Sequence, residues 1–134
     1  MKILFVCKHN KFRSKVAEAI FKKLNKNKEI KAKSKGVLLD EDSPYVAPIV
    51  VKFMKERGYI IGGKPKKIKI NEINKYDLLI IVADNVDSNF FISFGFKGKI
   101  VKWKIPDCDE TDYKCIKKDI DEIEKKIKEL IYNL

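Results

Sequence analysis

The sequence contains one histidine, His9, and three cysteines, Cys7, Cys108 and Cys115, and no two of the cysteines form a Cys-x-x-Cys pair. Structural zinc sites combine four Cys or His ligands at short spacings, so this set of residues does not favour one. A small, odd number of cysteines also argues against a fold that is held together by a framework of disulfides. From these absences we expect neither a metal site nor a disulfide framework.

Long hydrophobic runs are also missing. The longest strongly apolar stretch, LLIIVA at residues 78–83, is far shorter than the roughly 20 residues that cross a bilayer as a helix. At the N-terminus only ILFVC separates the first lysine from the next, which is too short for the apolar core of a signal peptide. We therefore expect a cytoplasmic protein that has no membrane partner.

Arginine is nearly absent, although the chain is strongly basic. Of its 30 basic residues 28 are lysines, and the two arginines are Arg13 and Arg57. A formal net charge of +11 is compatible with nucleic-acid binding. The lysines are nevertheless spread along the whole chain instead of forming one basic stripe, so we expect no nucleic-acid ligand. Arg13 follows a cysteine by six residues, and its placement needs an explanation.

Buried strands are predicted where apolar residues run continuously, as in parallel strands that are covered on both faces. The clearest strands are residues 2–7 (KILFVC) and 78–83, and residues 30–36 and 99–103 are weaker candidates.

Helices are predicted where apolar residues recur every three or four positions. Residues 14–26 form the first, and residues 43–57 (SPYVAPIVVKFMKER) form the second, with Ser43 as its N-cap and Pro44 at its first position. The C-terminal segment from Ile116 is a long amphipathic helix.

Two polar segments, residues 62–76 and 84–89, are surface connections that can contain a short helical turn. Strands that alternate with helices predict an α/β fold of βαβ units, with a parallel sheet covered by helices on both faces. No repeat or linker divides the chain, so we expect one domain over residues 1–134.

The segment CKHNKFRS, residues 7–14, connects the first predicted strand to the first helix. Ligands of α/β proteins bind at the carboxyl ends of the strands, where loop amides and a helix N-terminus favour an anion and stabilise a thiolate. Arg13 can hold two oxygens of a tetrahedral oxyanion with its planar fork, which lysine cannot do. Ser14 can donate to the sulfur of Cys7, and Asn10 tolerates a left-handed backbone. The segment therefore predicts a cysteine nucleophile in a phosphate-binding loop of the Cys-x5-Arg type, with a plain polar turn as the alternative.

The pattern Cys-x-x-Asn-x-x-Arg-Ser resembles the N-terminal signature of the low-molecular-weight protein tyrosine phosphatases and of the related thioredoxin-linked arsenate reductases. The resemblance extends over nearly the whole chain and implies a three-layer α/β sandwich, with a four-stranded parallel sheet flanked by helices. It also implies that Cys7 is the nucleophile, that Arg13 binds the oxyanion and that Ser14 stabilises the thiolate. The residues that it places around the oxyanion are Lys8, His9, Asn10, Lys11, Phe12 and Arg13.

A second similarity concerns KWKIPD, residues 102–107, which resembles the region that carries the general acid of these enzymes. It implies that Asp107 is the acid, and Asp109 in IPDCDETD is the alternative. Thr111 and Asp112 are better suited to capping the C-terminal helix. The family usually has proline after the acid, whereas this chain has Cys108.

Together these features predict hydrolysis of a phosphomonoester, with protein phosphotyrosine as the best-matching substrate, through a phosphocysteine intermediate. Cys7 attacks phosphorus, and Asp107 protonates the leaving group and later activates water. The mechanism needs no metal and no cofactor, and the partner is a phosphorylated protein or a small phosphomonoester. The candidates for an aromatic rim around its pocket are Phe12, Tyr45, Phe90 and Phe91.

Two other functions stay open. Arsenate reduction needs further thiols to release arsenite, and the reductases carry two cysteines in the region that here reads ADNVDSNFF, residues 83–91, without one. Cys108 with Cys115, or an external thiol reductant such as thioredoxin, would have to replace them. The other possibility is a non-catalytic oxyanion- or nucleic-acid-binding module, which would use Arg13 but has no need of Cys7.

Overall fold

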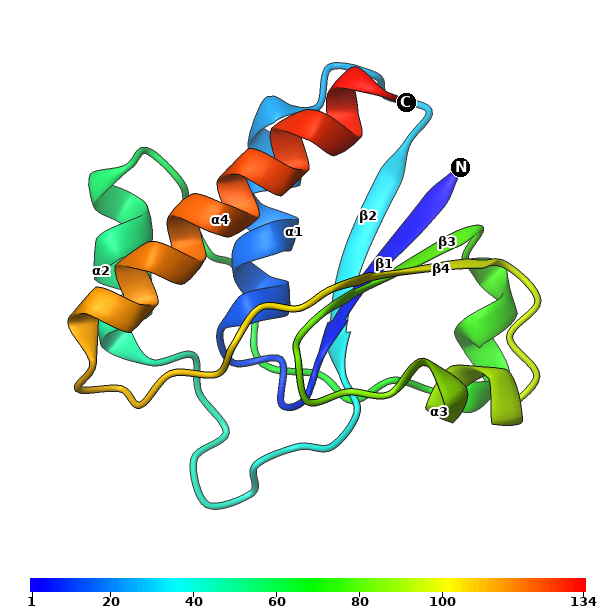
Figure 1. Ribbon diagram of the computed structural model, residues 1–134, viewed down its shortest axis with the longest axis horizontal. Helices are drawn as coiled ribbons and strands as arrows, with labels where there is room; N and C mark the ends of the chain where they lie inside the picture. The colour runs from blue at the N-terminus through cyan, green and yellow to red at the C-terminus, as the bar shows by residue number, and fades with distance from the viewer.

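Four strands form one parallel sheet in the computed structural model, which describes residues 1–134. The sheet has the order β2-β1-β3-β4 (Figure 1). The strands are β1 (Lys2–Cys7), β2 (Lys31–Gly36), β3 (Leu78–Val82) and β4 (Lys99–Trp103). The two continuous apolar runs occupy the centre of the sheet because both of their faces must be covered. The edge strands β2 and β4 carry lysines, which remain partly in water.

Helices cover both faces of the sheet. They are α1 (Arg13–Leu24), α2 (Pro48–Glu56), α3 (Ser88–Ser93), α4 (Tyr113–Tyr132) and the 3₁₀ helix η1 (Ile70–Lys75). Figure 1 shows α1, α2 and α4 on one side of the sheet and α3 on the other. Side chains alternate along a strand, so Ile3 and Phe5 enter the core under α1 and α4, and Leu4 and Val6 enter the core on the opposite side. The three-layer α/β fold and its four-stranded parallel sheet are thereby confirmed.

The second helix begins later than the sequence predicted. Its first residue is Pro48, and Ala47 is the N-cap, so the predicted start at Ser43 and Pro44 is wrong. A helix that began at Pro44 would contain Pro48 in its interior, where proline lacks the N–H that the helix needs and restricts the preceding residue to extended geometry. Ala47 indeed has φ −58° and ψ 130°.

The C-terminal helix is confirmed, and so is one of its predicted caps. The side chain of Asp112 accepts a hydrogen bond from Cys115 N at 3.2 Å. One disulfide is present, and it joins Cys108 to Cys115, whose Cα atoms are 5.8 Å apart. The turn before α4 brings the two cysteines within bonding range, which sequence spacing alone did not reveal. No helix has both the length and the apolar character that crossing a membrane requires.

Candidate active site

The loop between β1 and α1 lies at the carboxyl end of the sheet. Cys7 is the last residue of β1, pairs with Gly36 of β2 and is 2% exposed. A Cβ atom at Gly36 would lie 2.8 Å from the backbone carbon of His9 and 2.9 Å from the backbone nitrogen of Asn10. Only glycine therefore allows the loop to rest directly against the end of β2, and the sequence alone did not reveal this requirement.

Asn10 fixes the shape of the loop from beneath. Its φ is 55°, and it is the one residue other than glycine with a positive φ. The side chain is fully buried; its Nδ2 donates to Ser14 Oγ at 2.7 Å and to Ser34 Oγ at 3.0 Å, and its Oδ1 accepts from Lys66 N at 3.0 Å. These three hydrogen bonds hold a left-handed conformation that asparagine tolerates better than most residues. The predicted backbone role of Asn10 agrees with this geometry, and its partners Ser34 and Lys66 were missed.

Ser14 contacts the sulfur of Cys7 with two groups. Its Oγ lies 2.9 Å from Sγ, and its backbone N–H donates to Sγ over 3.4 Å. Because the hydroxyl oxygen already accepts a hydrogen bond from Asn10, its own hydrogen is available to the sulfur. Both groups can donate a hydrogen bond to a negative charge on the sulfur.

Arg13 is buried at 3% exposure and spans the carboxyl ends of β3 and β4. Its Nη1 donates to Ile105 O at 2.9 Å and to Asp84 Oδ1 at 3.4 Å, and its Nη2 donates to Asn85 Oδ1 at 3.1 Å. These contacts occupy three of the five N–H groups of a guanidinium. The N–H of Nε and one N–H of Nη2 make none of these bonds, and a guanidinium presents such groups in a planar fork that suits two oxygens of an anion.

A cavity of about 200 Å³ opens in front of the loop. Its walls include Cys7, Arg13 and Asp107, together with His9, Lys11 and Phe12. The structure thus brings the candidate nucleophile, arginine and acid to one cavity. Of the other predicted loop residues, Lys8 is exposed outside the cavity and Asn10 lies beneath the loop. A larger cavity of about 610 Å³ lies at the amino ends of β1 and β2 and contains neither a cysteine nor an acid.

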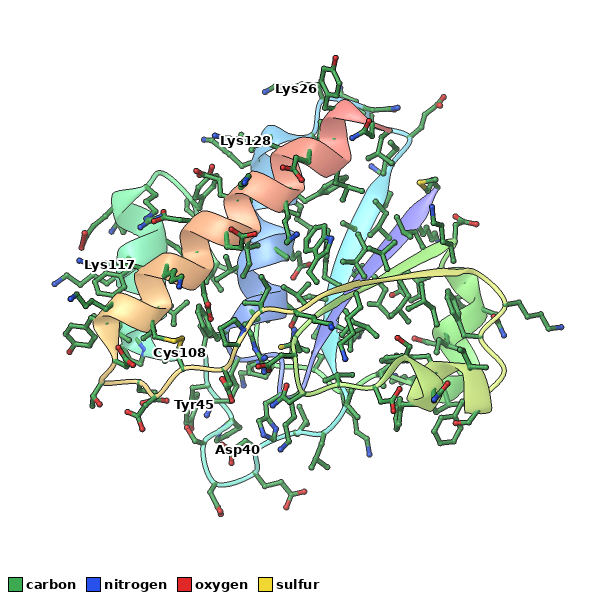
Figure 2. All side chains as sticks on the ribbon, viewed as in Figure 1. Lys26, Asp40, Tyr45, Cys108, Lys117 and Lys128 are labelled. Carbon is green, nitrogen blue, oxygen red and sulfur yellow. A yellow bond between two sulfur atoms is a disulfide. The ribbon has the colours of Figure 1, made fainter.

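The side chains of His9 and Lys11 are turned to the segment between β2 and α2. The Nδ1–H of His9 donates to Leu38 O at 2.8 Å, and Lys11 Nζ lies 3.1 Å from Asp40 Oδ2. The hydrogen bond from Lys11 lowers the pKa of Asp40. Figure 2 labels Asp40 in this segment, and Asp40 lines the same cavity as Cys108. His9 and Lys11 therefore attach the loop to its surroundings as well as lining the cavity.

The two candidate acids have different surroundings. Asp107 lines the cavity, and its Oδ1 lies 3.9 Å from Arg13 Nη2. Asp109 instead accepts hydrogen bonds from the backbone N–H and the hydroxyl of Thr111, and these bonds lower its pKa. A carboxyl group with a lowered pKa is a poor proton donor, so the geometry favours Asp107 over Asp109 as the acid.

Phe12 is the one candidate rim residue that lines the cavity. Tyr45 is 67% exposed, and Phe90 stacks edge-on against Phe91 with ring centres 5.1 Å apart. Phe91 is fully buried on the other side of the sheet. The structure therefore does not bring Tyr45, Phe90 or Phe91 to the cavity.

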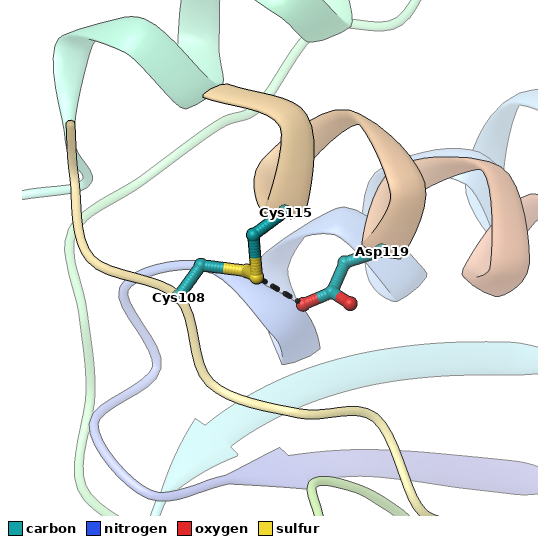
Figure 3. A group of neighbouring side chains, drawn as sticks. All are labelled: Cys108, Cys115 and Asp119. Carbon is teal, nitrogen blue, oxygen red and sulfur yellow. Dashed lines mark hydrogen bonds between the residues drawn. A yellow bond between two sulfur atoms is a disulfide. The ribbon is translucent and has the colours of Figure 1, made fainter. Parts of the chain in front are cut away.

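Asp119 is a further acidic residue at this site, and the sequence analysis missed it. It lies on α4 at 2% exposure, and burial raises its pKa to about 7, with Asp107 and Asp84 adding to the effect and Arg13 opposing it. Its Oδ2 lies 3.2 Å from Cys108 Sγ (Figure 3). A signal was present, because Asp119 occupies an apolar position of the helix between Ile116 and Ile120.

The site thus joins a buried cysteine at the end of a central strand, the loop that follows it and a buried arginine, all within a three-layer α/β fold. The chain belongs to the family described as low molecular weight phosphotyrosine protein phosphatase, whose model matches residues 2–134. The family resemblance found in the sequence is thereby confirmed. No curated protein matches the sequence.

Solved structures with the same fold include both phosphatases and reductases. A low molecular weight protein tyrosine phosphatase from T. tengcongensis has a TM-score of 0.84 and 28% identity, covering 100% of this chain and 99% of its own. An arsenate reductase from Archaeoglobus fulgidus has a TM-score of 0.77 and 28% identity, covering 96% of this chain and 98% of its own. An arginine phosphatase from Geobacillus stearothermophilus, with 19% identity, shares the fold at a TM-score of 0.80 over 98% of this chain and 91% of its own. The comparisons thus establish a family of enzymes without selecting one reaction.

Proposed function

We propose that the protein hydrolyses phosphomonoesters, with protein phosphotyrosine as the substrate class, through a phosphocysteine on Cys7. The observation that carries this proposal is the cavity that Cys7, Arg13 and Asp107 share. It holds a nucleophile, an oxyanion clamp and an acid, which are the three groups that phosphoryl transfer to and from a cysteine requires.

In the first step the thiolate of Cys7 attacks phosphorus, and the bond from phosphorus to the leaving oxygen breaks. The free edge of the Arg13 fork and the loop amides hold the non-bridging oxygens, where charge develops. Protonated Asp107 supplies a proton to the leaving oxygen. Phe12 offers an apolar wall for an aromatic leaving group. In the second step Asp107 takes a proton from water, which attacks the phosphocysteine and releases phosphate and the Cys7 thiolate.

Hydrolysis of p-nitrophenyl phosphate in the presence of a metal chelator tests the proposal. We expect Cys7→Ser to abolish turnover and Asp107→Asn to lower kcat about 10²-fold or more, because general acid–base catalysis contributes about that much. Asp109→Asn is the matched control and should stay near the wild-type rate. No phosphate release by the reduced wild-type protein would overturn the proposal. Retention of phosphate binding without turnover would point to a non-catalytic binding module.

Arsenate reduction is a second candidate function, and one observation favours it. Cys108 lines the same cavity as Cys7 and forms a disulfide with Cys115. Reduction of this disulfide would supply the second and the third thiol that the reaction needs. A thiol reductant such as thioredoxin would then be a partner, returning the disulfide to two thiols. Thiol-dependent release of arsenite that Cys108→Ser abolishes would support this function, whereas no release by the wild-type protein would dismiss it.

The proposed chemistry also bears on domain organisation and location. We propose that residues 1–134 act as one domain, because the cavity combines residues from β1, α1 and the segment before α4. We propose the cytoplasm as its location, because a reducing compartment keeps the nucleophilic thiol of Cys7 reduced.

A further inference from the structure

The disulfide between Cys108 and Cys115 lies directly beside the candidate active site. Cys108 follows Asp107 in the chain and lines the cavity that Cys7 opens into. Cys115 stands in the first turn of α4, and its Sγ lies 3.8 Å from the backbone oxygen of Asp107. One sulfur of this redox-active pair therefore shares a cavity with the cysteine that the proposed reaction uses.

The two cysteines have different surroundings, which assigns them different roles. Cys115 belongs to the first turn of α4 and does not line the cavity. Cys108 instead contacts a buried carboxyl group, since its Sγ lies 3.2 Å from Asp119 Oδ2 (Figure 3). Cys108 is thus placed to bond to Cys7 and has a partner for its proton, and Cys115 is placed to bond to Cys108.

The contact between Cys108 and Asp119 changes its donor with the redox state. A thiol at Cys108 can donate its hydrogen to an ionised Asp119. A disulfide sulfur carries no hydrogen, so the same contact is a hydrogen bond only when Asp119 holds the proton and donates it. Asp119 is therefore placed to take up the proton that Cys108 loses when the disulfide forms.

We propose that the Cys108–Cys115 pair and Asp119 form a second reactive centre, which reduces Cys7 after peroxide has oxidised it. The proposal rests on the proposed function in one respect, the assignment of Cys7 as a reactive thiolate. Peroxide converts that thiolate to a sulfenic acid. The sulfur of Cys108 then attacks the sulfur of Cys7 and a Cys7–Cys108 disulfide forms. The hydroxide that leaves takes a proton from the solvent and becomes water.

The second exchange releases the nucleophile. As Cys108 attacks Cys7, Asp119 accepts the proton that the Cys108 thiol loses. The thiolate of Cys115 then attacks Cys108 Sγ, so the Cys108–Cys115 bond forms and the Cys7 thiolate leaves. Two thiols have supplied the two electrons that reduce peroxide to water. A dithiol reductant returns the pair to thiols in a separate reaction.

Charged groups from each neighbouring element act on Asp119. Arg13 of α1 and Lys118 of α4 favour the ionised form of Asp119. Asp107 after β4 and Asp84 after β3 disfavour that ionised form. Burial is the largest effect, and it raises the pKa of Asp119 to about 7. Asp119 can therefore accept and return a proton near neutral pH, which suits repeated thiol–disulfide exchange.

Peptide mapping of the disulfides after oxidation tests the centre without relying on phosphatase activity. The protein is fully reduced, freed of reductant and treated with one equivalent of hydrogen peroxide. We expect the wild type to end with free Cys7 and a Cys108–Cys115 disulfide. Cys115→Ser should trap the Cys7–Cys108 disulfide. Cys108→Ser should leave Cys7 as a sulfenic acid, which a second equivalent of peroxide converts to a sulfinic acid that dithiothreitol does not restore.

Two results would overturn the proposal. One is a Cys115→Ser protein that forms no Cys7–Cys108 bond and oxidises Cys7 as far as Cys108→Ser does. The other is a Cys7→Ser protein in which peroxide closes the Cys108–Cys115 disulfide as fast as in the wild type, because the pair would then be oxidised without Cys7. Phosphate release is measured separately. If the protein proves to have no phosphatase activity, the two disulfide-mapping results still decide whether the pair reduces Cys7.

The rate of disulfide reduction by dithiothreitol tests Asp119 itself. Below pH 7 we expect Asp119→Asn to be reduced about tenfold more slowly than the wild type or more, because asparagine cannot protonate the departing Cys108 thiolate. The ratio of the two rates should approach one as the pH rises above 7, where Asp119 has lost its proton. Glu122→Gln, an exposed carboxyl on the same helix, is the matched control and should follow the wild type. A ratio that does not change with pH would show a merely structural effect and refute the role.

Discussion

Replacing Asp119 by asparagine tests whether the fold holds a protonated carboxyl group beside the candidate site. Asp119 is the one acidic side chain among the buried residues. Its pKa rises from 3.8 to about 7 on folding, chiefly because burial disfavours the charged form. Between these two values the folded protein keeps a proton that the unfolded chain has lost.

The sign and size of the stability effect follow from this difference. The folded state binds the proton of Asp119 more tightly than the unfolded chain does. The stability that Asp119 contributes is therefore fully present below about pH 4 and is lost as the pH rises through about 7. A shift of about three pKa units at about 1.4 kcal/mol each sets an upper limit of about 4 kcal/mol. The asparagine side chain of the variant does not titrate in this range, so the substitution removes the pH-dependent loss.

Urea denaturation of the disulfide form, without reductant, measures the free energy of unfolding. We expect the difference between Asp119→Asn and the wild type to move in favour of the variant by about 2 to 4 kcal/mol from about pH 4 to about pH 8. Glu122→Gln should show no comparable change, because its carboxyl group is exposed. A difference that is the same at both pH values would refute the argument that Asp119 is protonated in the fold.

Three further substitutions test the loop. Ser14→Ala should slow aryl phosphate hydrolysis about tenfold or more and slow the alkylation of Cys7 by iodoacetamide near pH 6, because a hydrogen bond to a charged sulfur is lost; equal alkylation rates would contradict this. Gly36→Ala should lower the free energy of unfolding by about 1 to 3 kcal/mol and reduce activity, because its Cβ would meet the loop backbone at 2.8 Å. Gly62→Ala is the control and should change neither quantity, because a Cβ there would have no atom within 4 Å. Arg13→Lys should weaken inhibition by inorganic phosphate and lower kcat about 10²-fold, and an unchanged inhibition constant would refute the fork argument.

The fold could be predicted largely because the central strands are continuous apolar runs. Residues 2–7 and 78–83 have no polar side chain that could face water between their ends, and both lie in the middle of the sheet. The start of α2 could not be predicted as well, because two prolines four residues apart both fit a first helical position. The position of Pro48 becomes decisive only when the cost of an interior proline is weighed.

The candidate site could be predicted where its residues are consecutive in the chain. The loop from Cys7 to Ser14 carries its chemistry in one segment, so spacing and residue type were sufficient to identify it. Its supports come from distant segments, since Ser34 lies on β2 and Asn85 follows β3. Hydrogen bonds between such segments depend on the register of the sheet, which no local pattern specifies. Asp119 alone left a local signal, as a carboxyl group on the apolar stripe of a helix.

The most direct test of the cysteine phosphatase mechanism is to find where the phosphoryl group goes. Asp107→Asn protein is mixed with p-nitrophenyl phosphate, quenched in acid and mapped by mass spectrometry. The leaving group of this substrate needs little protonation, so the first step proceeds while the loss of the base slows hydrolysis of the intermediate. The mechanism predicts one phosphoryl group on Cys7 and none in a Cys7→Ala control. Release of nitrophenol without phosphorylation of Cys7, or phosphorylation at another residue, would contradict it.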